Sequence, residues 1–273
     1  MDLKNLQKQA NEVRKGIIEG VYHAKSGHPG GSLSCADILT YLYFEKMNID
    51  VKNPKWEDRD RFVLSKGHCA PALYSVLANR GFFPVEYLKT LRKPDSFLQG
   101  HPDMKHTPGV DMSSGSLGQG ISAAAGMALS AKLSGKSYNV YTILGDGEIS
   151  EGQVWEAMMF ASHKKLTNLC VIIDNNNLQI DGSLDEVNSP YPIDAKLEAF
   201  GFNVVVIDGH DFNEIENAVN SFINCNDKPT AILAKTIKGK NVSFMENECE
   251  WHGAAPNEEQ YKIAMAELEG RVF

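Results

Sequence analysis

Short apolar runs alternate with longer amphipathic stretches along most of this chain. Apolar residues between Leu3 and Val21 recur at helical spacing and predict a first helix, followed by a turn rich in Gly and Pro around His28. Strands are predicted at residues 61–64, 140–144, 169–173, 204–207 and 230–234, with the fourth expected to be buried because it is β-branched and apolar. Strands that alternate with helices are typical of an α/β fold: an open, mostly parallel sheet with helices on both faces.

Polar residues follow two of these predicted strands directly. The run at 140–144 ends in Gly145-Asp146-Gly147, and the run at 169–173 is followed by Asp174 and three asparagines. Because parallel strands joined by a helix end at the same edge of a sheet, Asp146 and Asn176 should face one point. A carboxylate and an amide oxygen suit Mg²⁺ that holds a phosphate. Asp-Gly and Asn-Asn pairs also form ordinary turns, so a purely structural role stays open.

Composition narrows the class of protein. A chain of 273 residues can bury a sizeable core, and the lack of repeats or a long linker favours a single domain over residues 1–273. The net charge of −8 argues against nucleic acid and acidic membrane surfaces as partners. The N-terminus is polar, and no apolar run approaches the roughly 18 residues of a membrane span. Five widely spaced cysteines without a CxxC pair indicate reduced thiols in the cytoplasm.

Several histidines lie at predicted element boundaries. His68 follows the strand at 61–64 where a helix begins, a place where backbone N–H groups favour anions, although a lone histidine more often serves structure. His28 could be a simple cap residue, and His101 lies in a loop that also holds His106. Gly115, Gly118 and Gly120 precede an Ala-rich helix, where they suit either a diphosphate or tight helix packing.

The whole central stretch, GDGEISEG followed by DNNNLQIDG, resembles the thiamine diphosphate motif of transketolases. The resemblance implies that Asp146, Asn176 and the backbone carbonyl of Leu178 bind Mg²⁺, with Ca²⁺ or Mn²⁺ as possible replacements. It also implies that Gly147 approaches the cofactor, and that Glu151 lies near it at a contact between subunits.

Other segments extend the resemblance: SGHPGGSLS, RFVLSKGH, a Gly-His-Pro at 100–102, GSLGQG, AKTIKG and WHG. They imply substrate contact and proton transfer by His28, His101 and His252. They imply cofactor contact by His68, Gly115, Ser116, Leu117, Gly118, Lys238 and His252. The basic segment near Lys238 could alternatively be a solvated turn without a function. At the position where some relatives carry a lysine after the histidine of WHG, this chain has Ala254.

The resemblance extends from the first helix to about Phe273, and it corresponds to only the first of three transketolase domains. The family's catalytic Glu lies on the second domain. The hypothesis is therefore an N-terminal subunit of a split transketolase, which binds thiamine diphosphate and self-associates through this domain. With a separate C-terminal subunit carrying that Glu, as a heterotetramer, it would transfer two-carbon ketol units between sugar phosphates, as in the pentose phosphate pathway.

Three alternatives stay open from the sequence. The chain could be half of a related thiamine diphosphate enzyme with another donor: an apulose phosphate or sulfosugar transketolase, or an E1 α-type subunit. It could be a non-catalytic cofactor-binding subunit. A Mg²⁺-dependent phosphohydrolase would need a nucleophile or a second metal cluster, and no Asp-rich cluster of that kind is found in the sequence.

Overall fold

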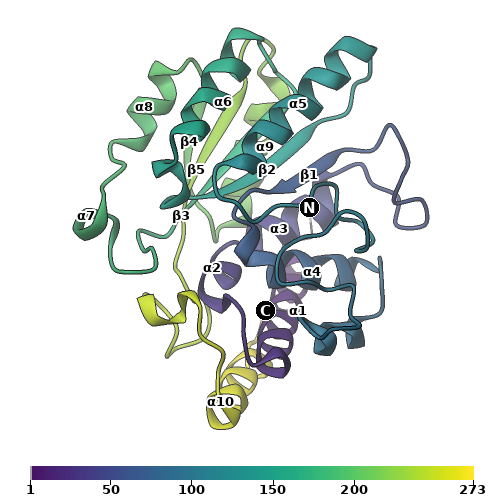
Figure 1. Ribbon diagram of the computed structural model, residues 1–273, viewed down its shortest axis with the longest axis vertical. Helices are drawn as coiled ribbons and strands as arrows, with labels where there is room; N and C mark the ends of the chain where they lie inside the picture. Colours follow the sequence, from purple (N-terminus) through teal and green to yellow (C-terminus); the bar gives the residue numbers. More distant parts are fainter. Residues whose placement is uncertain (1) are drawn as a thin grey trace.

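The fold is centred on a parallel sheet. The computed structural model describes residues 2–273, and within them five strands form one sheet in the order β1-β2-β3-β5-β4 (Figure 1). The strands are β1 (Arg61–Leu64), β2 (Val140–Gly145), β3 (Leu169–Asn175), β4 (Asn203–Asp208) and β5 (Thr230–Lys235). Each neighbouring pair of these strands runs parallel. The predicted open α/β sheet is therefore confirmed.

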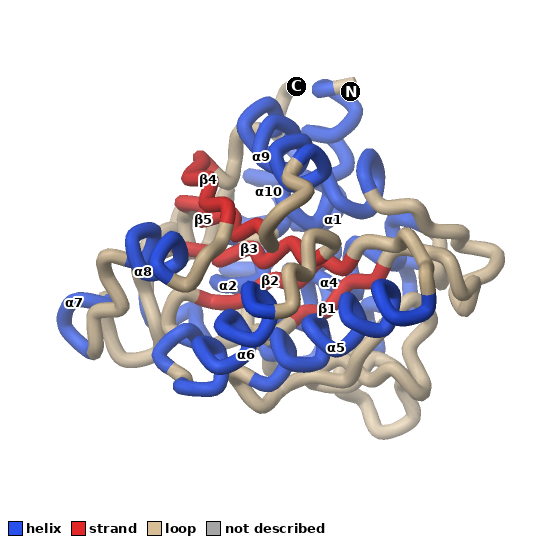
Figure 2. The backbone as a smooth tube through the Cα atoms, turned by 90° about the horizontal axis from the view of Figure 1, so that it is seen from above, coloured by secondary structure: helices blue, strands red, loops and turns tan. Residues whose placement is uncertain are grey.

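Helices cover both faces of this sheet, which lies between two helical layers in Figure 2. One layer contains α5 (Gln119–Ser134), α6 (Gly152–His163) and α8 (Ile193–Ala199), and the short α7 (Leu184–Val187) lies beyond it. The other contains α1 (Leu3–Ala24), α2 (Pro29–Ser34), α3 (Ala36–Tyr41), α4 (Ala70–Arg80), α9 (Phe212–Asn224) and α10 (Glu258–Glu269). Shorter helical turns are η1 (Leu42–Lys46), η2 (Gly67–Cys69), η3 (Val85–Thr90), η4 (Glu148–Ser150) and η5 (Cys249–His252).

The strands bury side chains on both faces, which explains their nearly continuous apolar runs. On β2, Tyr141 and Ile143 pack into the hydrophobic cluster that contains α1, α3, α4 and α9. Val140 and Leu144 point the other way, into the cluster formed by α5, α6 and α8. Alternate residues of one strand therefore fix helices on opposite sides of the sheet.

Two local predictions are wrong. Residues 204–207 lie on β4 at the edge of the sheet, so Val206 is 45% exposed rather than buried. The segment after His28 is the short helix α2 rather than a turn. Pro29 occupies the first position of α2, which suits the start of a helix. The helix packs tightly against the segment around Trp251, since a Cβ on Gly30 would come within 2.9 Å of the Trp251 carbonyl oxygen.

The register of β2 and β3 brings their carboxyl ends level, with Gly145 opposite Asp174. The residues that follow both strands therefore meet at one edge of the sheet, as the sequence predicts. No helix within residues 2–273 combines the length and apolar character needed to cross a bilayer.

Candidate active site

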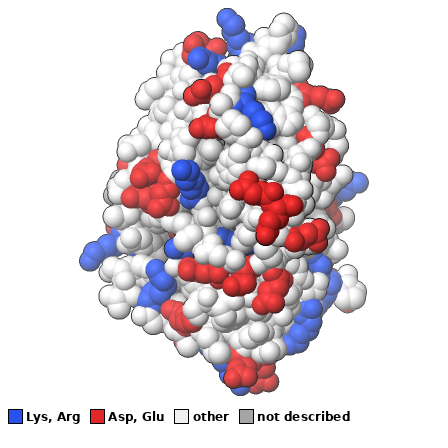
Figure 3. Space-filling view, turned by 90° about the vertical axis from the view of Figure 1, so that its left-hand side faces the viewer, with Lys and Arg blue, Asp and Glu red and all other residues white. Residues whose placement is uncertain are grey.

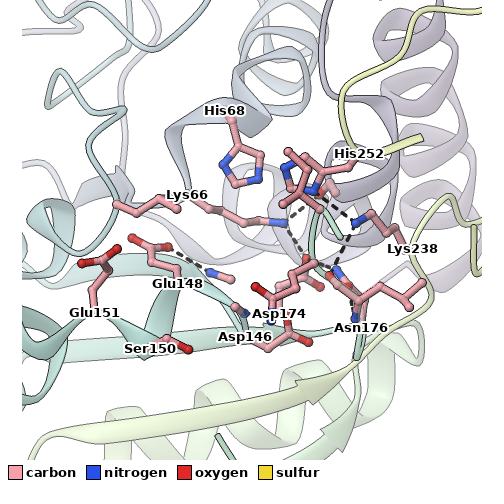
Figure 4. Close-up of a pocket in the computed structure, with 17 residues that line it drawn as sticks. Lys66, His68, Asp146, Glu148, Ser150, Glu151, Asp174, Asn176, Lys238 and His252 are labelled. Atoms are coloured by element: carbon pink, nitrogen blue, oxygen red, sulfur yellow. Dashed lines mark hydrogen bonds and ion pairs between the residues drawn. The ribbon is translucent and has the colours of Figure 1, made fainter. Parts of the chain in front are cut away.

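A pocket of about 360 Å³ opens over the carboxyl ends of β2 and β3. In Figure 4, His68 and His252 lie on one side of it, and Asp146 and Asn176 lie on the opposite side. The lining residues are Gly31, Lys66, His68, Leu117, Gly145, Asp146, Gly147, Glu148, Ser150, Glu151, Asp174, Asn176, Leu178, Gln179, Ile180, Lys238 and His252. The fold thus gathers segments from across the chain around one cavity.

Asp146 is a buried carboxylate held by donors of the two strand ends. Its Oδ1 accepts a hydrogen bond from the Gly147 amide at 2.9 Å. Its Oδ2 accepts from the Asn177 amide at 2.6 Å and from Asn175 Nδ2 at 3.0 Å. Burial, with the nearby Asp174 carboxylate, raises the pKa of Asp146 to about 6. Because burial and the nearby Asp174 disfavour the ionised form of Asp146, a cation in the pocket would stabilise that form.

Asn176 and Leu178 reach the same pocket because the chain turns sharply between them. Asn177 has a φ of 64°, the left-handed conformation that asparagine tolerates better than most residues. The Leu178 amide then donates to Asn176 Oδ1 at 3.2 Å. The structure therefore brings Asp146, Asn176 and Leu178 together, while their role as metal ligands stays a prediction.

A metal here would depend on a mixed set of oxygens. Within residues 2–273, no three or more His, Cys, Asp or Glu side chains come together as a metal site. The predicted set offers one carboxylate, one amide oxygen and one backbone carbonyl. Hard cations such as Mg²⁺ accept such a set when phosphate oxygens complete the coordination shell.

Lys238 brings a positive charge into the pocket without a carboxylate to balance it. Its side chain is buried, and its Nζ donates to the Leu178 carbonyl at 3.4 Å and lies 3.2 Å from His252 Nδ1. No Asp or Glu oxygen among the described residues lies within 4.0 Å of it. Burial lowers the pKa of Lys238. The alternative interpretation of this segment as a solvated turn therefore does not fit, and the position of Lys238 suits an anion.

Three histidines from distant segments form a cluster above the carboxylate side of the pocket. The ring centroids of His28 and His68 are 5.2 Å apart, those of His28 and His252 are 5.5 Å apart, and those of His68 and His252 are 5.1 Å apart and stacked. Burial is the largest cause that lowers their pKa values, to about 4 for His28 and His68 and about 3 for His252. All three rings are neutral near pH 7, so they can donate or accept hydrogen bonds.

His101 and the glycine loop lie beside this cluster rather than within the main pocket. His101 is exposed, and a Cβ on Gly115 would come within 3.0 Å of its ring, so the glycine permits this close approach. Gly115 has a φ of 152°, which also favours glycine. Leu117 lines the main pocket, whereas Gly115 and Ser116 line a neighbouring hollow. These residues therefore form a rim, not the floor.

Glu148 is a site residue that motif reasoning passed over. Its Oε1 accepts from the Gly118 amide at 2.9 Å and from Ser65 Oγ at 2.5 Å, and its Oε2 accepts from the Gly145 amide at 3.0 Å. One buried carboxylate thus fixes the entry to α5 against the ends of β1 and β2. Glu151 lies at the mouth of the pocket and packs closely against Gly118. A Cβ added to Gly118 would lie 2.9 Å from the Cβ of Glu151.

The buried ion pair of Lys66 and Asp174 was also missed from the sequence. Lys66 Nζ lies 2.5 Å from Asp174 Oδ2, and both side chains are essentially inaccessible to solvent. Burial raises the pKa of Asp174, but Lys66 and the hydroxyl groups of Ser34 and Thr236 outweigh it and hold the pKa below its ordinary value. The only sequence signal was position, since both residues come at strand ends.

The residues of this pocket fit a divalent cation and an anionic group together. Among residues 2–273, no basic side chain forms an ion pair with the buried Asp146 carboxylate, and no carboxylate forms one with the buried Lys238 ammonium. Both line the same cavity. A metal diphosphate would balance both charges at once, because buried charges are stable only when they are paired.

Comparison with known proteins agrees with this chemistry. Residues 6–269 match the family described as "Transketolase, thiamine diphosphate binding domain". The 6-deoxy-6-sulfo-D-fructose transketolase subunit of Clostridium sp. (strain MSTE9) is 49% identical over 265 residues, which are 97% of this chain and 96% of that protein. An apulose-4-phosphate transketolase subunit of Phocaeicola vulgatus is 42% identical over 272 residues, 100% of this chain and 96% of that protein.

Full-length transketolases match over a smaller part of their own length. The crystal structure of transketolase from Campylobacter jejuni superposes with a TM-score of 0.92 and 36% identity, over 98% of this chain and 43% of that one. Human transketolase is 44% identical over 255 residues, 92% of this chain and 40% of that protein. The chain therefore spans about two fifths of these longer relatives.

Proposed function

The chain belongs to the transketolase family, as a thiamine diphosphate binding N-terminal subunit, and from this premise we propose that it is one half of a split transferase of two-carbon ketol units. The proposal rests on one observation: Asp146 and Asn176 line the same pocket as Lys238, whose ammonium forms no ion pair with a carboxylate of the described residues. That arrangement fits a metal-bound diphosphate, and the neutral histidine cluster above it fits a sugar.

In this proposal the carboxylate side of the pocket holds the metal. Asp146, Asn176 and the Leu178 carbonyl coordinate Mg²⁺, with Ca²⁺ or Mn²⁺ as replacements. Lys238 and His68 face the diphosphate. The rim formed by Gly115–Gly118, with Gly147 and Glu151, packs against the rest of the cofactor.

The histidine side handles protons and sugar hydroxyl groups. Thiamine diphosphate supplies the nucleophilic carbon and the electron sink for breaking the bond beside a ketose carbonyl. His28, His101 and His252 hold the sugar and exchange protons with its oxygens. A neutral imidazole suits this role, because it can accept a proton at one nitrogen and donate from the other.

The donor is proposed to be a ketose phosphate, and the acceptor an aldose phosphate. Relatives named for 6-deoxy-6-sulfo-D-fructose and for apulose-4-phosphate differ in that donor. A sulfosugar is the second candidate, since the relative with that name is 49% identical to this chain.

A partner chain is part of the proposal. Relatives of the same length are named as subunits, and full transketolases are more than twice as long. A C-terminal subunit would bring the catalytic Glu, and two copies of the present chain would associate through the cofactor domain in a heterotetramer. The described cysteines are free thiols, in keeping with the proposed cytoplasmic location.

The deciding experiment is a ketol-transfer assay with thiamine diphosphate and Mg²⁺. The chain is assayed alone and with the product of an adjacent reading frame that resembles the missing half. Xylulose 5-phosphate and 6-deoxy-6-sulfofructose are compared as donors, with ribose 5-phosphate as acceptor. Activity only in the mixture is expected. Activity of the chain alone would overturn the split-enzyme proposal.

A substitution tests the metal assignment separately. Asp146→Ala should abolish Mg²⁺-dependent cofactor binding, because it removes the only charged ligand, while the fold remains intact. Calorimetric titration with thiamine diphosphate, with and without Mg²⁺, measures the loss, and circular dichroism checks the fold. Unchanged affinity in the variant would remove Asp146 from the metal site.

A further inference from the structure

The side chain of Asn176 has two different ends, and the structure assigns each to a different neighbour. Its Nδ2 faces Asp174 Oδ2 at 3.3 Å and Ser34 Oγ at 3.4 Å. Its Oδ1 accepts from the Leu178 amide at 3.2 Å, on the side of the pocket. A carboxamide turned by 180° would instead place an N–H₂ group where a cation ligand is needed, and an N–H₂ group cannot bind a cation.

Asp174 decides which end of the amide faces inward. An ionised carboxylate only accepts hydrogen bonds, so the neighbouring amide must present its N–H₂ group to it. Asp174 also accepts from Ser34 Oγ and Thr236 Oγ1, each at 2.5 Å. Each carboxylate oxygen thus has a donor, and the reversed amide would place two oxygen acceptors against each other.

Lys66 keeps this carboxylate ionised and in place. Its Nζ lies 2.5 Å from Asp174 Oδ2 and donates to the Gly31 carbonyl at 2.7 Å. These contacts tie the end of β1 and the helix α2 to β3, directly beneath the pocket. In Figure 4, Lys66 lies between His68 and the carboxylate side of the site, where Asp174 stands beside Asp146 and Asn176.

We propose that Asp174, held by Lys66, is a positioning residue that orients the Asn176 amide so that its oxygen faces the metal. The inference rests on the proposed metal site of Asp146, Asn176 and Leu178. It adds a function for an ion pair that touches neither substrate nor cofactor in that proposal. Groups that orient metal ligands in this way commonly change metal affinity by about 10- to 100-fold when they are replaced.

The test measures metal binding by the full chain rather than turnover. Mn²⁺ is titrated in the presence of thiamine diphosphate, and free Mn²⁺ is followed by electron paramagnetic resonance. Asp174→Asn leaves Lys66 without its counterion, so it is combined with Lys66→Met to avoid an orphaned buried charge. The double variant should bind Mn²⁺ about 10- to 100-fold more weakly than the native chain. Thr236→Val is the matched control, because it removes a donor from the other carboxylate oxygen, and it should stay close to native affinity.

A second variant separates amide orientation from general damage. Asp174→Asn combined with Asn176→Asp exchanges the two groups, and a carboxylate at position 176 presents oxygen whichever way it turns. Metal affinity should return toward the native value, with Lys66 still facing one negative charge.

The outcomes distinguish this inference from the proposed function. Native affinity in a folded Asp174→Asn, Lys66→Met variant would overturn the inference. A folded exchange variant that binds as weakly as the Asp174→Asn, Lys66→Met variant would also overturn it, since the loss would then not come from amide orientation. Failure of the native chain to bind Mn²⁺ at this site with thiamine diphosphate would overturn the metal assignment itself.

Discussion

Two buried lysines face the same pocket in opposite electrostatic states. Lys66 and Lys238 are 2% and 1% exposed. Lys66 contacts a carboxylate at 2.5 Å, and although burial opposes it, Asp174 raises the pKa of Lys66 well above its ordinary value. Within the described part of the chain, the polar partners of the Lys238 ammonium are a carbonyl and an imidazole, and burial lowers the pKa of Lys238.

The difference separates a structural charge from one that is ready for a ligand. A buried ion pair with its hydrogen bonds satisfied has its charges balanced, so it needs no ligand to neutralise them. A buried ammonium without a counterion is unstable where it stands, and such groups concentrate at functional sites. The same pocket edge therefore contains an anchor, Lys66, and a second lysine, Lys238, that we propose to bind an anion.

The largest expected effect comes from breaking the anchor. Lys66→Met leaves Asp174 as a buried, unpaired carboxylate, which should lower the free energy of unfolding by about 3–5 kcal/mol. Urea denaturation followed by circular dichroism measures this loss. The Lys66→Met, Asp174→Asn double variant removes both charges and should recover most of the stability. If the single variant is as stable as the native chain, Lys66 is not an anchor.

A smaller effect is expected from His68, whose pKa reflects its burial first and the charge of Lys66 second. Its pKa of about 4 in the folded state is below the ordinary value of 6.5. Between those values the unfolded chain binds more protons, so stability is full above pH 6.5 and falls as the pH is lowered. For this single group the loss between pH 7 and pH 5 should be about 2 kcal/mol.

His68→Gln tests this effect by difference. Both proteins are unfolded with urea at pH 7 and pH 5, and the variant should lose less stability on acidification. His28, His252 and Asp146 titrate in both proteins, so the difference reports the loss of His68 together with its influence on the pKa values of His28 and His252. Equal losses would mean that His68 is already protonated, or exposed, in the folded chain.

The carboxylate side of the site was predictable from sequence because local topology creates it. Two parallel strands joined by a helix bring Asp146 and Asn176 to the same edge of the sheet. This placement follows from the connectivity and does not depend on which residues form the connecting helix. That inference uses contacts between residues that end adjacent strands.

The histidine side was not predictable from spacing. His28, His68 and His252 come from three segments far apart in the chain, and only tertiary packing brings their rings within 5.5 Å of each other. Family resemblance supplied these residues. The anchor pair of Lys66 and Asp174 was missed for the same reason, since 108 positions separate them. The prediction that β4 is buried was wrong for a related reason. The apolar residues of a strand do not show whether it lies in the centre or at the edge of the sheet, and β4 lies at the edge.

Overall surface charge gives no hint of an anion site either. The net charge is −8, and acidic side chains gather in several groups on the face shown in Figure 3. Attraction of a diphosphate must therefore come from local charge inside the pocket. Lys238 is the proposed source of this local charge, and its substitution tests whether its role differs from that of Lys66.

Lys238→Met should leave the unfolding free energy near its native value, because the variant loses a buried charge that has no counterion. It should weaken binding of thiamine diphosphate with Mg²⁺ by about tenfold or more, the cost of one charge-assisted hydrogen bond. Calorimetric titration gives the affinity, and Lys235→Met, at an exposed position three residues earlier, is the matched control. A stability loss as large as that of Lys66→Met, with unchanged affinity, would make Lys238 a second anchor and remove the distinction between the two lysines.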